Sequence, residues 1–445
     1  MSEEAITYYH GEAAPSSSKV TSSGDNAVLL DLIRCNDLTQ LTIDNSGDYY
    51  NDTEDTFLVD DGDDLNWLAH HIGRNNSLTS LRILTDCLQD EMLREINHNR
   101  SIETLEIYDQ MNFNINCLAD FLAVNKLKVL CLEGVGLGDD GVVALSSASM
   151  NQSQLKHLSI LSLPSNRIGE DGCLALKPML GSITTYLKVL DLSFNGINDE
   201  GLEVMVEGLL ECGNLKTLDL SFNPFITAEG LKHLSTLLLS TKCTLETLLL
   251  EDVDMGDDGV EALAVGLVNN KSLKKLVFDP NTSDITAVGW SAFSRLLCDI
   301  SSINSTHRSN HTLQVIGEDC EDLTSTPHDI SYYLKMNKSN RQVARCKVLL
   351  NHRDLDFEAF FIYELKLLPA VVTWFRAAED CSFQLLQSFR EFGIRELSTY
   401  FKFFQGNPTL VADAQRDYML SSIMKKRKSE EEASIMKRAK HLQTI

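Results

Sequence analysis

A nine-residue phrase that returns along the middle of the chain constrains the fold more than any other feature. It is clearest as Leu187-Lys-Val-Leu-Asp-Leu-Ser-Phe-Asn195 and as Leu215-Lys-Thr-Leu-Asp-Leu-Ser-Phe-Asn223. From Leu127 to Leu273 six copies start 31, 29, 28, 30 and 28 residues apart, at Leu127, Leu158, Leu187, Leu215, Leu245 and Leu273. Further copies start at Leu38, Leu78, Ile102 and Leu313. This period predicts a stack of one structural unit rather than a single globular core.

Each copy has the residues that a strand, a turn and a helix require. The three Leu positions suit a buried short parallel strand, and the Asn can satisfy backbone groups where the chain leaves that strand. Residues 199–210 then place apolar side chains at helical spacing after an acidic start, as a helix N-terminus favours. We therefore expect an α/β fold, a curved solenoid with parallel strands on the concave side and helices on the convex side.

The repeat resembles the ribonuclease-inhibitor-like class of leucine-rich repeats. The resemblance is carried by the length of 28–29 residues, the Asn position, and glycines at Gly141, Gly172, Gly201 and Gly259. It extends over residues 27–316 and is strongest over 102–295, although Val135 and Val253 stand where the Asn is expected. The resemblance implies a protein-binding concave surface, without implying a particular partner.

The remaining segments differ in composition from the repeats. Residues 1–25 are rich in Ser, Gly and acid, which predicts disorder, and the solenoid is expected over 26–316 with an acidic insertion at 45–64. A C-terminal helical block is expected over 326–420, followed by a basic tail at 421–445. The segments 333–340, 343–347 and 367–375 of that block resemble the C-terminal extension of leucine-rich-repeat proteins from diatoms and related algae.

Charge and cysteine usage indicate the class of partner and compartment. The formal charge is −25, but the last 25 residues carry seven Lys or Arg against three Glu, which leaves −29 for the body. Such a body repels phosphate backbones, so we expect a basic protein partner and no nucleic acid, with simple solubility as the alternative explanation. Eleven dispersed cysteines without a CxxC pair are typical of reduced core thiols. With no signal peptide and no membrane span in the sequence, an intracellular protein, cytoplasmic or nuclear, is expected.

Motifs for familiar chemistry are missing from the sequence. It holds no GxxxxGK[ST], GxGxxG after a strand, HExxH or GxSxG, so no cofactor, catalytic residue or enzymatic activity is predicted. The acidic insertion has Gly62 but no closing Glu after it, which disfavours a calcium loop. His70 and His71 are adjacent on an expected helix and so do not share a face for metal binding. No metal site is predicted.

The best candidate site is the concave surface of the expected strands. Side chains between and just after the last two Leu positions should point outward and form an acidic surface with hydroxyls and one aromatic ring. They are Glu106, Tyr108, Glu133, Asp191, Ser193, Asp219, Ser221, Glu251 and Asp279. Charge complementarity favours a basic protein or peptide there. The alternative is that the Asp-x-Ser phrase is ordinary filling of these repeats.

Two further interpretations concern activity and location. A GTPase-activating protein resembling the regulator of Ran is the alternative function, although no residue of this chain can be matched to that activity. A substrate-recruiting subunit of a ligase complex is a third possibility. The basic tail suits a two-part nuclear import signal. Its candidate residues are Lys425, Lys426, Arg427, Lys428, Lys437, Arg438 and Lys440.

Overall fold

The computed structural model describes part of the chain in two compact units. Described are residues 31–44, 56–58, 66–84, 89–109, 113–151, 153–183, 186–280, 284–317, 326–339 and 343–352. The first unit holds the described residues up to 296 and those from 312 to 331, and the second holds 297–311 and the described residues from 332. The expected disordered N-terminus, most of the acidic insertion, the helical block beyond 352 and the basic tail lie outside the described residues.

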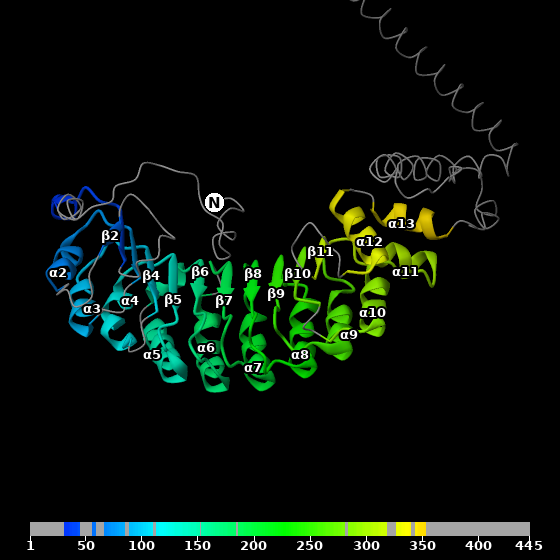
Figure 1. Ribbon diagram of the computed structural model, residues 1–445, viewed down its shortest axis with the longest axis horizontal. Helices are drawn as coiled ribbons and strands as arrows, with labels where there is room; N and C mark the ends of the chain where they lie inside the picture. Colours follow the sequence, from blue (N-terminus) through cyan, green and yellow to red (C-terminus); the bar gives the residue numbers. More distant parts are fainter. Residues whose placement is uncertain are drawn as a thin grey trace, which may run out of the picture. The chain divides into compact units, whose positions relative to one another are not determined.

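The first unit is a leucine-rich-repeat solenoid around one parallel sheet. Its eleven strands follow the order β11-β10-β9-β8-β7-β6-β5-β4-β3-β1-β2, and every printed pairing is parallel. The strands are β1 Gln40–Asp44, β2 Thr56–Leu58, β3 Ser80–Leu84, β4 Thr104–Tyr108, β5 Val129–Glu133, β6 Ile160–Ser162, β7 Val189–Asp191, β8 Thr217–Asp219, β9 Thr247–Leu249, β10 Lys275–Val277 and β11 Val315–Ile316. Figure 1 shows them side by side along the inner edge of a curved array.

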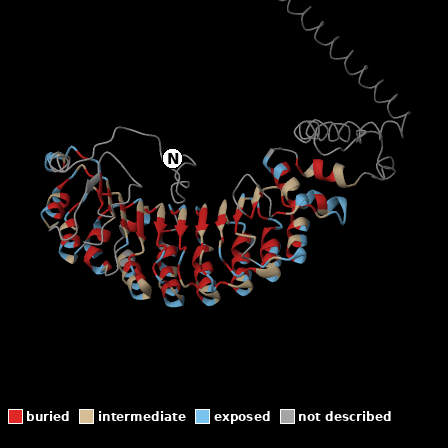
Figure 2. Cartoon of the chain, in the orientation of Figure 1, coloured by how far each residue is buried: buried red, intermediate tan, exposed pale blue. Residues whose placement is uncertain are grey.

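Helices form the outer layer of this array (Figure 1). They are α2 Asn66–Arg74, α3 Asp90–Ile96, η4 Ile115–Leu118, α4 Ala119–Val124, α5 Gly138–Asn151, η5 Ser153–His157, α6 Glu170–Ile183, α7 Asp199–Leu209, α8 Ala228–Leu239, α9 Gly256–Leu267 and α10 Ala287–Leu297. Figure 2 places the buried residues between strands and helices, where the repeated Leu side chains, such as Leu190, Leu218 and Leu248, have no exposed surface. The curved α/β solenoid expected from the repeat is confirmed.

The repeat phrase locates the strands with little error. Each of the ten predicted repeat starts, from Leu38 to Leu313, stands two residues before the first residue of a strand. This holds for the weak copies as well as the strong ones, because the apolar positions of a short buried strand determine its register. The eleventh strand was not expected. β2 lies inside the acidic insertion and pairs with β1 through Thr42 and Thr56, so part of the insertion belongs to the sheet.

The Asn of the phrase connects consecutive repeats. The Asn195 side-chain amide donates to the carbonyls of Leu163, Leu192 and Ser193 at 2.9–3.0 Å, and its carbonyl accepts from the backbone of Asn166 and Ile168. Asn223 repeats this arrangement one coil further on. The predicted role of the Asn is confirmed, and it also satisfies the preceding repeat, which helps to explain why Val135 is tolerated: Asn166 reaches back to Leu132 and Leu137.

A second row of asparagines lies where the helices end, and sequence reasoning missed it. Asn99 donates to the carbonyls of Ile72 and Asn75 and accepts from the backbone of Ser101 and Ile102. Buried Asn75, Asn125 and Asn270 make equivalent bonds to neighbouring coils. The available signal was an Asn three residues before the first apolar position of the phrase in the copies at Leu78, Ile102 and Leu273.

The described part of the second unit is helical. It contains α11 Ile303–Arg308, the greater part of α12 His328–Ser339, and α13 Val343–Asn351. Met336, Val343 and Cys346 form its small core, with Tyr332, Tyr333 and Leu350 packed against them. Buried within it, the Lys347 ammonium donates to the carbonyls of Leu297 at 2.5 Å and Asn310 at 3.0 Å.

Candidate functional site

The register of the strands brings the predicted concave residues into two rows. The first row runs across the middle of the strands and contains Arg82, Glu106, Cys131, Ser162, Asp191, Asp219 and Leu249. Because side chains alternate along a strand and their neighbours, such as Leu190 and Leu218, face the helices, this row faces the concave side. Three of the nine predicted residues, Glu106, Asp191 and Asp219, therefore share one row.

The second row lies two residues further along each coil. Tyr108 pairs with Glu133 in the sheet register, and backbone bonds from Phe194 to Ser221 and from Phe222 to Glu251 continue the ladder beyond the strands. Ser193, Ser221, Glu251 and Asp279 occupy this position in their repeats. All nine candidates therefore belong to these two rows on the strand side of the repeat.

Exposure divides these nine residues into two groups, and one expectation is corrected. Asp191, Ser193 and Ser221 are buried, with exposed fractions of 9%, 7% and 3%. The Asp191 carboxylate accepts from the Ser162 hydroxyl, the Ser193 hydroxyl and the Ser193 backbone at 2.8–3.0 Å, because it folds onto the turn that follows β7. Instead of pointing freely outward, these side chains hold the turns, and the half-buried remainder forms the accessible surface: Glu106, Tyr108, Glu133, Asp219, Glu251 and Asp279.

A cation that sequence reasoning missed modifies one end of the surface. The Arg82 guanidinium on β3 lies 3.3 Å from the Glu106 carboxylate and 4.9 Å from the centre of the Tyr108 ring. The Tyr108 hydroxyl in turn donates to Glu106 at 3.1 Å. Applying the same register to the weak copy at Leu78 would have found Arg82. At this end of the row the positive charge of Arg82 therefore offsets the negative charge of Glu106. The concave surface is most acidic from β5 onward.

Cys131 also belongs to the concave row rather than to the core between sheet and helices. It is fully buried there beneath its neighbours, and burial, with the nearby Glu106 carboxylate as a second cause, raises the pKa of its thiol to about 12. The thiol is therefore protonated and unreactive at neutral pH. All eight described cysteines are free thiols.

Glu133 is the acidic side chain with the least favourable environment for its charge. Burial raises its pKa above the ordinary value, the carboxylates of Asp109 and Asp191 raise it further, and Arg82 opposes them. A cation brought to this position would relieve the cost of ionising Glu133. The site can therefore gain electrostatic energy from a positively charged ligand.

A stacked aromatic pair borders the second row. Phe194 and Phe222 stack with ring centres 4.0 Å apart and planes 9° apart, and Phe194 remains 52% exposed. Both have a left-handed backbone, with φ of 54° and 56°, which bulky residues rarely adopt. Phe225, 64% exposed, follows in the next turn. Such residues provide apolar contact area beside the carboxylates.

In the described ranges no group of three His, Cys, Asp or Glu side chains is arranged to hold a metal ion. The His70 and His71 rings lie edge to face, and His70 contacts Glu95 at 3.2 Å. Of the helices that the structure describes, none has the length and apolar character needed to cross a membrane.

Comparison with known proteins agrees with the repeat architecture. A family profile described as leucine-rich repeat matches residues 185–206, 211–235 and 241–264. The chain contains leucine-rich repeats. It is 31% identical over 174 residues to mouse "NACHT, LRR and PYD domains-containing protein 14", and 34% identical over 146 residues to the ribonuclease inhibitor of Sus scrofa. An internalin structure from Listeria monocytogenes covers 68% of this chain and 72% of its own, with 14% identity and a TM-score of 0.33.

These leucine-rich-repeat relatives are matched only in part. The alignments cover 36% and 32% of this chain, but only 17% of the NACHT-containing protein and 31% of the ribonuclease inhibitor. The similarity therefore concerns the repeats and not the whole of either relative. The alternative of a GTPase-activating protein gains no support from these matches.

Proposed function

We propose that this chain is a non-enzymatic scaffold whose leucine-rich repeats bind a basic segment of a partner protein on their concave face. The observation that carries the proposal is the group of half-buried carboxylates on the two concave rows, Glu133, Asp219, Glu251 and Asp279, bordered by the stacked Phe194 and Phe222 rings. The proposal also draws on a relative with similar repeats, the ribonuclease inhibitor of Sus scrofa, whose name describes action on another protein.

The chemistry of the surface favours a Lys- or Arg-bearing ligand. Asp219, Glu251 and Asp279 follow one another on the neighbouring coils of β8, β9 and β10, and Glu133 lies three coils before Asp219, at the end of β5. Adjacent parallel strands lie about 4.8 Å apart. An extended basic segment crossing the strands can therefore place successive cations near Asp219, Glu251 and Asp279, and a longer segment can also reach Glu133. The desolvated Glu133 gains most from such a partner, since its pKa is raised when no cation is present.

The aromatic pair adds a contact that is not electrostatic. The exposed face of Phe194 can receive an aliphatic side chain, or an Arg guanidinium stacked on the ring. Large aromatic side chains with little conformational freedom are common energetic centres of protein interfaces. The proposal therefore predicts that binding depends on Phe194 as well as on the carboxylates.

The test compares a charge-reversed concave face with a charge-reversed convex face. Glu251→Lys with Asp279→Lys changes two half-buried concave carboxylates, and Glu203→Lys with Glu261→Lys makes the same charge change on exposed positions of α7 and α9. Asp191 is left intact because it supports a turn. Proteins captured by the unmodified chain are purified, and their Kd is measured with each variant at low and high salt.

The proposal is supported by a basic partner that binds the convex variant with unchanged affinity and the concave variant at least about tenfold more weakly. Its binding to the unmodified chain should also weaken at high salt. Circular dichroism verifies that both variants are folded. If captured partners bind both variants equally, the concave carboxylates are filling residues of the repeat and the proposal fails.

A further inference from the structure

A basic surface lies on the flank of the solenoid where the helices end and the strands begin. Between β3 and β10, the seven segments that lead from a helix into a strand contain nine Lys or Arg and only three Glu. We define the basic flank by its nine cations, which are Arg100, Lys126, Lys128, Lys156, Lys188, Lys216, Lys242, Lys271 and Lys274. The chain as a whole carries −25, so this flank has the opposite sign to the molecule.

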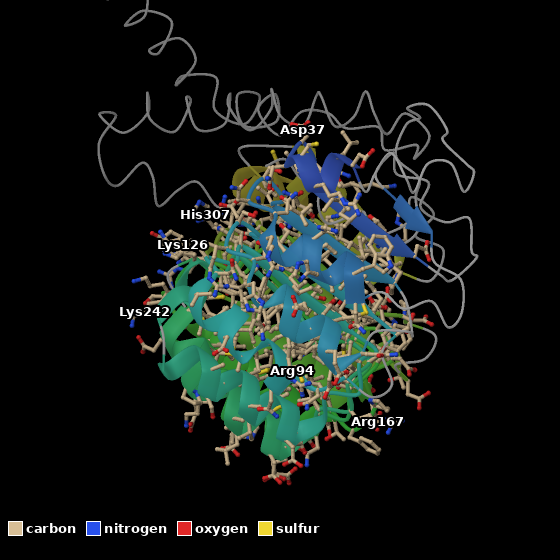
Figure 3. All side chains as sticks on the ribbon, turned by 90° about the vertical axis from the view of Figure 1, so that its left-hand side faces the viewer. Asp37, Arg94, Lys126, Arg167, Lys242 and His307 are labelled. Carbon is tan, nitrogen blue, oxygen red and sulfur yellow. The ribbon has the colours of Figure 1, made fainter. Side chains whose placement is uncertain are left out.

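The opposite flank has the reverse composition. The segments that lead from β4 to β10 into the following helices contain six Asp or Glu, two of which are Glu251 and Asp279 of the concave rows, and one cation, Arg167. Figure 3 looks along the array and shows Lys126 and Lys242 on one side of the fold and Arg167 on the other. The sheet therefore separates two flanks of opposite charge.

Backbone hydrogen bonds align several of these cations. Ser159 donates its backbone N–H to Lys128, Lys188 donates to Ser159, and Lys216 donates to Lys188, at 2.7–2.8 Å. Lys128, Lys188 and Lys216 therefore belong to one row across neighbouring coils, with about 4.8 Å between adjacent strands. At that spacing Lys128 and Lys188 are about 10 Å apart along the row, within one Debye length at 0.1 M salt.

Glutamates form ion pairs with four of the nine cations of the flank. Lys128 pairs with Glu103, Lys242 with Glu211, and Lys216 and Lys274 share Glu246. Among the described residues, Lys126, Lys156 and Lys188 on three consecutive repeats are exposed and form no ion pair, and the same holds for Arg100 and Lys271 near the two ends of the flank. The ring of half-exposed Tyr186 lies beside them, 5.7 Å from that of His157. The repeats of β5, β6 and β7 therefore present uncompensated positive charge together with an aromatic ring.

Helix dipoles explain only part of this arrangement. Cations near helix C-termini are favourable, but the effect decreases within the last turn. The helices α4 to α9 carry no basic residue in their last turn. Lys156 lies in the last turn of the short 3-10 helix η5, and the other eight cations stand in the connections that lead into the strands, where a ligand lying along the flank would meet them.

We propose that the basic flank binds an Asp- and Glu-rich segment of another protein, centred on Lys126, Lys156 and Lys188. The row from Lys128 to Lys274 crosses five strand spacings, about 24 Å, which an extended segment of about seven or eight residues spans. A short acidic segment can follow this strip alone. A long nucleic acid would also approach the acidic faces of a chain of charge −25 and be repelled.

The probe is a labelled peptide of about eight alternating Asp and Glu residues, with an Asn and Gln peptide of equal length as the neutral control. Binding to the full chain is measured by fluorescence anisotropy at two salt concentrations. The flank variant is Lys126→Gln, Lys156→Gln, Lys188→Gln. The matched control, Arg94→Gln, Lys177→Gln, Lys232→Gln, removes three positive charges from α3, α6 and α8. Repeating both in a chain with Lys425→Gln, Lys426→Gln, Arg427→Gln and Lys428→Gln removes four of the seven cations of the basic tail and so lowers its contribution.

The flank variant is expected to bind the acidic peptide at least about tenfold more weakly, and the control less than about twofold more weakly. Binding by the unmodified chain should weaken as salt rises. Equal loss in both variants, or no binding of the acidic peptide, overturns the proposal. A single-stranded oligouridylate of similar length serves as the nucleic-acid probe. If it binds more tightly than the acidic peptide and its binding depends on the same three lysines, the proposal is overturned in favour of a nucleic-acid ligand. The concave variants leave this result unchanged, because the two surfaces are separate.

Discussion

At the residue scale, the amides of single asparagines connect neighbouring coils. Asn195 makes three donor and two acceptor bonds to backbone groups in a buried site. Asn195→Val introduces the residue that another repeat has at the same position, Val135. In the repeat of Asn195 the substitution leaves several buried backbone N–H and C=O groups without a hydrogen-bond partner. We expect the free energy of unfolding to fall by about 2–4 kcal/mol, measured by urea denaturation. The control is Asn116→Val, at an exposed position. If Asn195→Val lowers the free energy of unfolding no more than this control does, water replaces the amide of Asn195.

Lys347 presents a different residue-scale problem, a buried ammonium held by two carbonyls. Burial lowers its pKa to about 7, while the neighbouring Cys298 acts in the opposite direction. Its surroundings include the Tyr333 ring, 5.5 Å from the ammonium, and His311, whose pKa burial and Lys347 lower to about 4. The described residues of the second unit therefore enclose a group that is easily deprotonated.

The pH dependence follows from where each state holds the Lys347 proton. The unfolded chain keeps it up to the ordinary value of 10.5, and the folded chain releases it near pH 7. The unfolded state therefore binds more protons between these values, and stability rises with pH across that window. Lys347→Met removes this rise. Denaturation at pH 7, 8 and 9 should show wild-type stability increasing relative to the variant; parallel curves would contradict a shifted pKa.

At the element scale, the acidic first turn of one helix caps the next helix. The Asp199 carboxylate accepts from the backbone of Thr227 and Gly230 and from the Thr227 hydroxyl, at 2.6–2.9 Å. Asp257 does the same for Thr286 and Gly289. A side chain at Gly230 would overlap the Asp199 carboxylate, so that Gly is needed for this contact rather than for an unusual backbone angle.

A double-mutant cycle tests this cap between helices. Asp199→Ala should cost about 1–2 kcal/mol, as loss of a cap does, and Gly230→Ala should also destabilise. Once Asp199 is truncated, the added methyl group meets less resistance, so the two effects should be non-additive by about 1 kcal/mol. Gly181→Ala provides the control, since nothing lies within 4 Å of a Cβ there. Additive effects would mean that the cap and the glycine act independently.

The same scale shows which features the sequence could predict. Strand positions follow from local apolar spacing, so even the weak copies at Leu38 and Leu313 were placed correctly. The burial of Asp191 depends on Ser162 from another coil, and Lys347 finds its acceptors 37 and 50 residues away. Phe194 is exposed because it occupies a left-handed turn, which hydropathy does not report. The sequence therefore predicts the fold better than the site, because the fold follows from local spacing and the site depends on contacts between residues that are distant in the sequence.

At the scale of the whole molecule, charge is distributed among separate surfaces. The concave face carries carboxylates, one flank carries nine cations, and the sequence ends with seven more in residues 421–445. A basic ligand of the concave face and an acidic ligand of the flank would occupy different elements of the same coils. A scaffold of this kind can hold two partners of opposite charge at once, provided that both proposals are correct.

The basic tail provides the last prediction, which concerns location in the cell. Lys425, Lys426, Arg427 and Lys428 precede Lys437, Arg438 and Lys440 at a spacing suited to import carriers with acidic grooves. Replacing the first four by Gln in a fluorescent fusion of the full chain should lower the nuclear share of fluorescence. Arg94→Gln, Lys177→Gln and Lys232→Gln on the helices should leave it unchanged, because the signal depends on clustered rather than total charge. If the tail substitutions leave the distribution as it was, the cluster is an ordinary solvated charge run, and charge complementarity to the acidic concave face becomes the property of the tail to examine.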